Sequence, residues 1–172
     1  EMKKLLSAPD PAPSVASMAR AGVLGAVLAG AEDRALAPLV HLEGGREARW
    51  QARLGALGLH DWSEGLRLSR AEAREMAGLR EAVAEGWPPA VAGWKLGAAL
   101  GGDAVLVRAA LAELPLPEGW EAEVARGAAA VFPVRAADLP ALSGPALGAK
   151  LKELEARWLQ ADLRPSRAEL LG

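Results

Sequence analysis

The apolar positions near the C-terminus repeat with the period of an α-helix. Leu147, Leu151, Leu154 and Trp158 are spaced so that they share one helical face. Gly144-Pro145 precedes them, and proline is favoured in the first turn of a helix. The pattern predicts an amphipathic helix that docks through this face, with Trp158 at its buried end.

Helix-start and helix-stop residues divide the rest of the chain into short segments. Ser69 and Glu72 have the spacing of a capping box, which predicts a helix to about residue 85. Pro88-Pro89 predicts a helix that stops at Gly101-Gly102, and Asp103 then caps an apolar helix at 105–114. Similar signals predict helices at 11–22, 23–28, 36–42, 46–57 and 118–130, an extended segment at 132–135, and a capped last turn after Ser166.

The composition favours helices over sheet. Half of the 172 residues are hydrophobic, mainly alanine and leucine, and there is no isoleucine or tyrosine. The sequence therefore predicts an all-α fold of about ten short helices. The longest apolar run, 21–31, is about half of what a membrane span needs. The absence of cysteine excludes disulfides and thiolate chemistry, which fits a cytoplasmic location.

The charge distribution is uneven. The formal net charge of −2 argues against a nucleic-acid binder. Residues 1–80 carry 11 basic and 10 acidic groups, residues 81–125 carry 2 and 7, and residues 126–172 carry 7 and 5. The acidity thus lies in the middle of the chain, and both ends are slightly basic.

Catalytic chemistry is not indicated by any motif. The two histidines, His41 and His60, are isolated and lack metal-ligand spacing. No Asp-x-Asp follows a Gly-Ser loop, so the usual apparatus of two-metal nucleotidyl transfer is missing. We expect no catalytic or metal site in this chain.

Two basic groups are candidates for binding phosphates. Arg67, Arg70 and Arg74 surround the helix start at Ser69, where backbone amides and the helix dipole favour anions. The alternative is that they are solvated and paired with Glu72 and Glu75. The second group lies after Gly144 and Gly148 and consists of Lys150, Lys152, Arg157, Arg164 and Arg167. The two glycines either allow close helix packing or leave backbone amides open to bind a phosphate.

Three blocks of sequence carry a resemblance when taken together. The first is Glu1-Met-Lys-Lys-Leu-Leu with Ala8-Pro-Asp-Pro and Met18-Ala-Arg-Ala-Gly-Val-Leu, and the second is Leu66-Arg-Leu-Ser69 before an acidic helix. The third is Phe132-Pro-Val with Asp138-Leu, Ser143-Gly-Pro-Ala-Leu-Gly and Leu154-Glu-Ala-Arg-Trp158. In this order they resemble the end of the neck, the body and the C-terminal segment of bacterial CCA-adding tRNA nucleotidyltransferases and poly(A) polymerases, particularly of the alphaproteobacterial type. Residues 86–130 match only loosely.

The resemblance implies a division of the chain. Residues 1–62 correspond to the end of the neck and the following helices, 63–131 to the helical body, and 132–172 to a tail with the C-terminal docking helix. Because the chain begins inside the last neck motif, we expect the nucleotidyltransferase head upstream of it. The fold implied for this part is an elongated array of helices without the head domain.

The resemblance also implies a function. This region would hold the acceptor stem and elbow of tRNA while the head adds or repairs the 3′-terminal CCA, and CCA addition and poly(A) synthesis both stay open. Mg²⁺ and CTP or ATP are expected for the full-length enzyme, and this fragment, which needs no cofactor, should be inactive alone. We expect no DNA or membrane partner, and homodimerisation stays open. The alternative function is a helical protein-interaction or dimerisation module without RNA binding.

Overall fold

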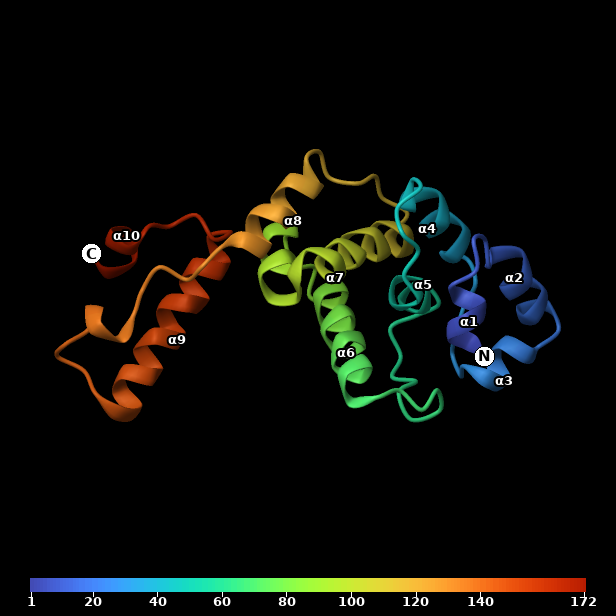
Figure 1. The fold of residues 1–172 in the computed structure, drawn as a ribbon, viewed down its shortest axis with the longest axis horizontal. Helices are drawn as coiled ribbons and strands as arrows, with labels where there is room; N and C mark the ends of the chain where they lie inside the picture. Colours follow the sequence, from blue (N-terminus) through green and yellow to red (C-terminus); the bar gives the residue numbers. More distant parts are fainter.

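A computed structural model describes residues 1–172 and shows ten α-helices, one short 3₁₀ helix and no strand. The molecule is elongated, with the N-terminal helices at one end and α9 and α10 at the other (Figure 1). The predicted all-α class is confirmed. The elements are α1 (Met2–Leu6), α2 (Ala12–Arg20), α3 (Val23–Val27), α4 (Leu36–Glu43), α5 (Trp50–Ala56), α6 (Arg70–Ala84), α7 (Pro89–Ala112), α8 (Trp120–Ala129), η1 (Ala136–Asp138), α9 (Gly144–Gln160) and α10 (Arg167–Leu171).

A buried arginine joins the N-terminal helices. Arg53 of α5 is only 1% exposed, and its guanidinium donates to both carboxylate oxygens of Glu43 at 3.0 and 2.8 Å. It also donates to the carbonyl oxygens of Leu6, Ala8 and Pro9. A buried charge is tolerated only when it is paired and hydrogen-bonded. Arg53 therefore fixes the α1–α2 connection against α4 and α5.

The long helix α7 is broken at Gly97, which has φ 78° and ψ 170°. The break brings the two halves together, since a Cβ on Gly101 would lie 2.8 Å from the carbonyl oxygen of Ala92. The predicted helix end at Gly101-Gly102 is therefore wrong, and so is the predicted cap at Asp103, which lies inside the helix. Glycine at 101 serves close packing, whereas the positive φ of Gly97 makes the turn.

Backbone contact also joins α7 to α8. A Cβ on Gly127 would lie 1.8 Å from the carbonyl oxygen of Ala90, and one on Gly93 would lie 2.1 Å from that of Val124. Any side chain at these two glycines would force the helices apart. The α7–α8 pair thus forms a rigid centre, on which the cavity described below is built.

The tail docks on this centre through aromatic side chains. Trp158 of α9 is 3% exposed and packs edge-on against Trp94 and tilted against Phe132, with ring centroids 5.5 Å apart in both pairs. Leu154 is also buried, while Leu147 and Leu151 are half-buried. The predicted docking helix is confirmed, with its contact concentrated in the C-terminal half of α9.

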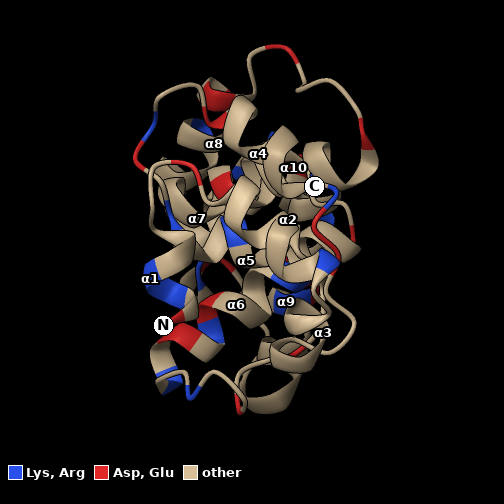
Figure 2. Cartoon of the chain, turned by 90° about the vertical axis from the view of Figure 1, so that its right-hand side faces the viewer, with Lys and Arg blue, Asp and Glu red and all other residues tan.

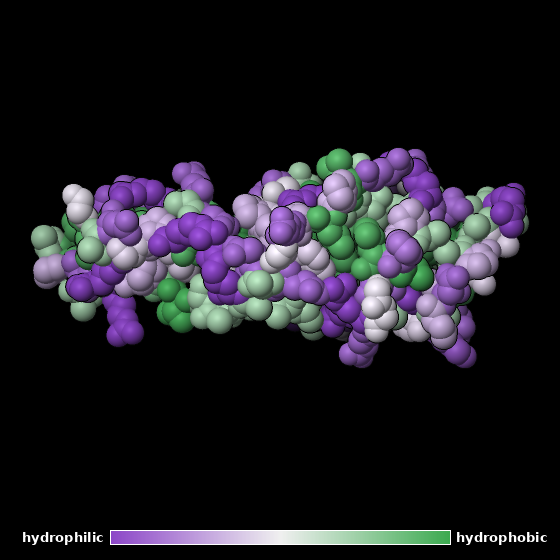
Figure 3. Space-filling model, turned by 90° about the horizontal axis from the view of Figure 1, so that it is seen from above, coloured by the Kyte–Doolittle hydropathy of each residue, from purple (hydrophilic) through white to green (hydrophobic).

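The surface is mixed in character. Figure 3 shows apolar side chains gathered near the middle of the long axis, where the α7–α8 connection runs in Figure 1. Leu114 of this connection is 62% exposed. By length and composition α7 alone qualifies as a candidate membrane span, but 61% of its most apolar stretch is buried inside the protein.

Candidate functional site

The start of α6 is built by its capping box. The Ser69 hydroxyl accepts from the Glu72 amide at 3.3 Å, and the Glu72 carboxylate accepts from the Ser69 amide at 2.8 Å. Lys3 of α1 donates to the other Glu72 oxygen at 2.5 Å. This bond from Lys3 and the bonds from Ser69 lower the pKa of Glu72 to about 2. The predicted capping box is confirmed. The Glu72 carboxylate lies at the start of α6, at the position where a bound phosphate was expected.

Three arginines around this cap remain free. Arg67, Arg70 and Arg74 are exposed and make no hydrogen bond or ion pair within the chain. The interpretation that pairs them with Glu72 and Glu75 is wrong, because Lys3 binds Glu72 and Gln51 donates to Glu75 at 2.9 Å. We call Arg67, Arg70 and Arg74 the α6 ridge.

The surroundings of the α6 ridge add further charge. Figure 2, which views the end of the molecule with the N-terminus, shows basic segments on α1 and near α6, with acidic segments among them. Lys4 of α1 is exposed and also has no partner within the chain. Free guanidinium groups on an exposed ridge are the groups that bind phosphates with two parallel hydrogen bonds.

The tail group has a different environment, because most of its members have partners within the chain. The pairs are Lys150 with Glu153 at 2.8 Å, Arg157 with the carbonyl of Glu169 at 2.6 Å, Arg164 with Glu123 at 3.5 Å and Asp162 at 3.4 Å, and Arg167 with Asp138 at 2.5 Å. The bond from Arg167 lowers the pKa of Asp138. Of the group, Lys152 alone is exposed and unpaired. The paired side chains therefore serve contacts within the chain, and their charge is not free for a ligand.

The two predicted basic groups do not form one face. The α6 ridge lies at the start of α6 and the tail group on α9 and α10, and these elements are separated along the long axis (Figure 1). Close packing does not explain the glycines of α9, since nothing lies within 4 Å of a Cβ placed on Gly144 or Gly148. Gly144 has φ 54°, so its conformation favours glycine.

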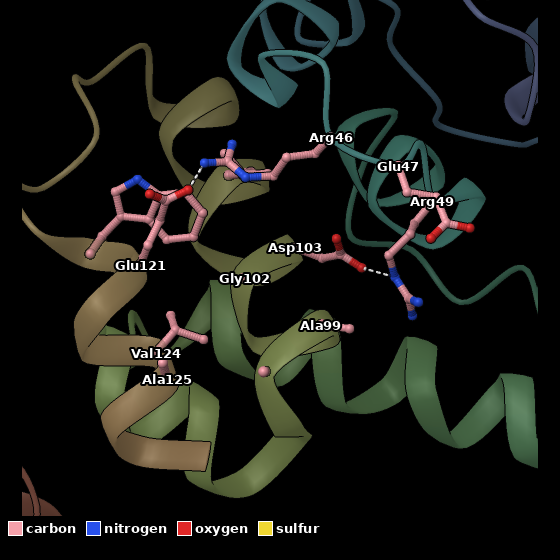
Figure 4. A pocket seen from close by; sticks show the side chains of 12 residues that line it. Arg46, Glu47, Arg49, Ala99, Gly102, Asp103, Glu121, Val124 and Ala125 are labelled. Carbon is pink, nitrogen blue, oxygen red and sulfur yellow. Dashed lines mark hydrogen bonds and ion pairs between the residues drawn. The ribbon is translucent and has the colours of Figure 1, made fainter. Parts of the chain in front are cut away.

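A cavity of about 320 Å³ lies between residues 46–49, α7 and α8 (Figure 4). Arg49 donates to Asp103 at 2.6 Å, while Arg46 pairs with Glu121 and covers the Trp120 ring at 4.8 Å. Asp103 is 7% exposed, and burial raises its pKa to about 6. The residues that line the cavity are Arg46, Glu47, Arg49, Ala98, Ala99, Gly102, Asp103, Leu106, Trp120, Glu121, Val124 and Ala125.

This cavity was not predictable from the sequence, because its walls come from three separate segments. The available signal was a lone carboxylate, Asp103, in an otherwise apolar helix, and the pattern suggested a cap there. The two histidines stay apart: His60 packs on Trp62 with centroids 5.6 Å apart, and His41 is exposed on α4. No group of three or more metal-ligating side chains is present.

Comparison with known proteins gives no relative of this chain: no family model, curated protein or solved structure matches it. Functional inference therefore rests on the residues themselves. The two features that could bind a ligand are the α6 ridge and the cavity at Asp103.

Proposed function

We propose that this chain binds tRNA, as the helical C-terminal region of a template-independent nucleotidyltransferase that adds or repairs the 3′-terminal CCA. The head that would do the chemistry, with Mg²⁺ and CTP or ATP, would lie upstream in a cytoplasmic enzyme. Three sequence blocks in the order of that family support the proposal, and so does the all-helical, elongated fold. CCA addition and poly(A) synthesis both fit this region.

The observation that carries the proposal is the α6 ridge. An exposed basic side chain beside a carboxylate usually forms a surface ion pair, as most basic groups of the tail do. Arg67, Arg70 and Arg74 have no such partner, although Glu72 and Glu75 are close to them in sequence. Side chains four residues apart, such as Arg70 and Arg74, lie about 5–6 Å apart at Cβ on one helical face. They can contact neighbouring phosphates of one strand.

Binding through this ridge would read backbone and shape, not base sequence. Phosphate contacts fix the position of a protein on a nucleic acid, and double-stranded RNA is recognised largely by shape and by sugar and phosphate contacts. Helix α6 is anchored in the core by the buried Met76, Leu79 and Val83, so the ridge has a packed base. Such a clamp suits the folded stems of tRNA.

The test is a charge-matched pair of triple variants. We expect Arg67→Gln/Arg70→Gln/Arg74→Gln to weaken tRNA binding at low salt and to reduce the salt slope by about 2 to 3, at nearly one unit per phosphate contact. The control, Arg20→Gln/Arg34→Gln/Arg135→Gln, removes the same charge from exposed positions outside both basic groups. If the two variants lose the same tRNA affinity, the ridge contributes only to the overall charge of the protein, and a localised site is contradicted.

A second candidate function is a protein-interaction or dimerisation module. The apolar surface over the α7–α8 connection favours it, with Leu114 exposed there, and Val131 is 79% exposed after α8. This alternative predicts concentration-dependent dimerisation in light scattering that Leu114→Ser abolishes, and no retention of RNA at low salt. A monomer that binds tRNA would exclude it.

A further inference from the structure

We infer that the cavity between residues 46–49, α7 and α8 binds a small organic cation, an amidinium or primary ammonium group on a flat apolar body, with Asp103 as its acceptor. This site is separate from the α6 ridge and does not depend on RNA binding. The inference rests on the unused oxygen of Asp103, the charges of the lining and the shape of the walls.

Asp103 offers an acceptor that the chain itself does not use. Its Oδ2 accepts from Arg49 Nε at 2.6 Å, whereas Oδ1 makes no hydrogen bond within the protein. Figure 4 shows this second oxygen pointing away from Arg49, toward the side of the cavity where Arg46 lies. Asp103 is only 7% exposed, yet no fully buried side-chain oxygen of the chain lacks a partner, so Oδ1 lies at the cavity surface, where it can accept from a donor that replaces water.

The charges that line the cavity select a cation over an anion. Arg46 is matched by Glu121 and held over Trp120, and Arg49 is matched by Asp103. Glu47 lines the same cavity without any ion pair. With two arginines and three carboxylates, the lining has one net negative charge, and a cationic donor would complete the pairing of Asp103 without displacing Arg49.

The walls set the shape of the ligand. Beside the charged groups the lining is apolar, contributed by Ala98, Ala99, Leu106, Val124 and Ala125. A volume of about 320 Å³ is at the small end of the usual range for ligand cavities. The combination of an apolar wall and one buried acceptor fits a single flat ring that carries a cationic donor at its edge.

The test uses three probes that share one ring: benzamidine, neutral benzamide and anionic benzoate. Binding to the whole chain is measured at pH 7.5 by ligand-observed NMR titration. We expect benzamidine to bind at least about tenfold more tightly than benzamide, as for a hydrogen bond to a charged group, and benzoate not to bind. Binding of benzamidine should weaken as the pH falls through about 6, where Asp103 takes up a proton. The charged groups that act on Asp103 are Arg49, Glu43 and Glu75. Those that share its cavity are Arg46, Glu47 and Glu121.

Two variants and a control locate the site. Asp103→Asn keeps the shape and removes the charge, so it should lose about tenfold in benzamidine affinity while the helical circular dichroism is retained. Ala99→Trp fills the cavity from an exposed position and should abolish binding, whereas Ala112→Trp, exposed on the same helix but outside the lining, should leave it unchanged. The inference is overturned if benzamidine does not bind, if Asp103→Asn binds it as tightly as the wild type, or if benzoate binds equally well.

Discussion

Trp158 should act as the principal anchor of the tail. It is almost fully buried, and its ring packs against both Trp94 of α7 and Phe132 of the extended segment. Replacing it with alanine removes these two aromatic contacts and opens a cavity between α9 and the α7–α8 centre. The helix would then be held by Leu154, by the partly buried Leu151 and Leu159, and by surface contacts such as that of Arg157 with the Glu169 carbonyl.

The magnitude follows from the burial. Truncation of a buried tryptophan or phenylalanine to alanine typically costs about 3–5 kcal/mol, from lost apolar transfer and the cavity left behind. Aromatic pairs contribute about 0.5–1.5 kcal/mol each beyond their buried area, so the Trp94 and Phe132 contacts favour the upper part of that range. Exposed ion pairs near the tail, such as Arg164 with Glu123, are worth at most about 1 kcal/mol and cannot compensate.

The assay is urea unfolding followed by circular dichroism, together with hydrogen exchange of the α9 amides. Trp158→Ala should lower the free energy of unfolding by about 3–5 kcal/mol, or release α9 first, with loss of its exchange protection. Lys152→Ala, exposed on the same helix, is the control and should change stability by less than about 0.5 kcal/mol. A loss below about 1 kcal/mol with unchanged α9 protection would refute the docking of α9 through Trp158.

Two further predictions concern the centre of the molecule. Gly127→Ala should destabilise the protein by about 1–3 kcal/mol or more in urea, because its methyl group would collide with the Ala90 carbonyl. The control Gly148→Ala, which meets open space, should be neutral or stabilising by up to about 1 kcal/mol, and equal effects would refute the close α7–α8 contact. For Asp103, burial raises the pKa to about 6 in the native state, so its contribution to stability is greatest below about pH 4 and is lost as the pH rises from about 4 to about 6. Asp103→Asn should remove this fall from the curve of unfolding free energy against pH, and a variant curve parallel to the wild type between pH 4 and 6 would contradict the raised pKa.

Local chemistry decided which features were predictable from sequence. Both capping boxes formed as expected at Ser69 and Ser166, because the cap residues satisfy neighbouring amides without help from distant segments. The buried stripe of α9 was also predictable, since helical spacing alone places Leu154 and Trp158 on one face. The all-α class followed from the same local signals.

Features that depend on long-range contact were not predictable. Gly101 and Gly102 have the pattern of a helix end, yet the turn occurs at Gly97, and glycine at 101 lets the two halves of α7 meet. Nothing in the sequence near Asp103 indicated that Arg49 would pair with it from the connection before α5. Likewise, only the fold shows that Lys3 binds Glu72 and so leaves the α6 ridge unpaired.

The most direct test of the proposed function is the binding of this purified chain to fluorescent tRNA, measured by anisotropy at low and moderate salt. A hairpin of the acceptor stem alone is measured beside it. We predict salt-sensitive binding that is tighter for whole tRNA than for the hairpin, with a slope that reports the phosphates engaged. Absence of binding to either RNA at low salt would contradict an RNA-holding role for this chain and favour the protein-interaction module.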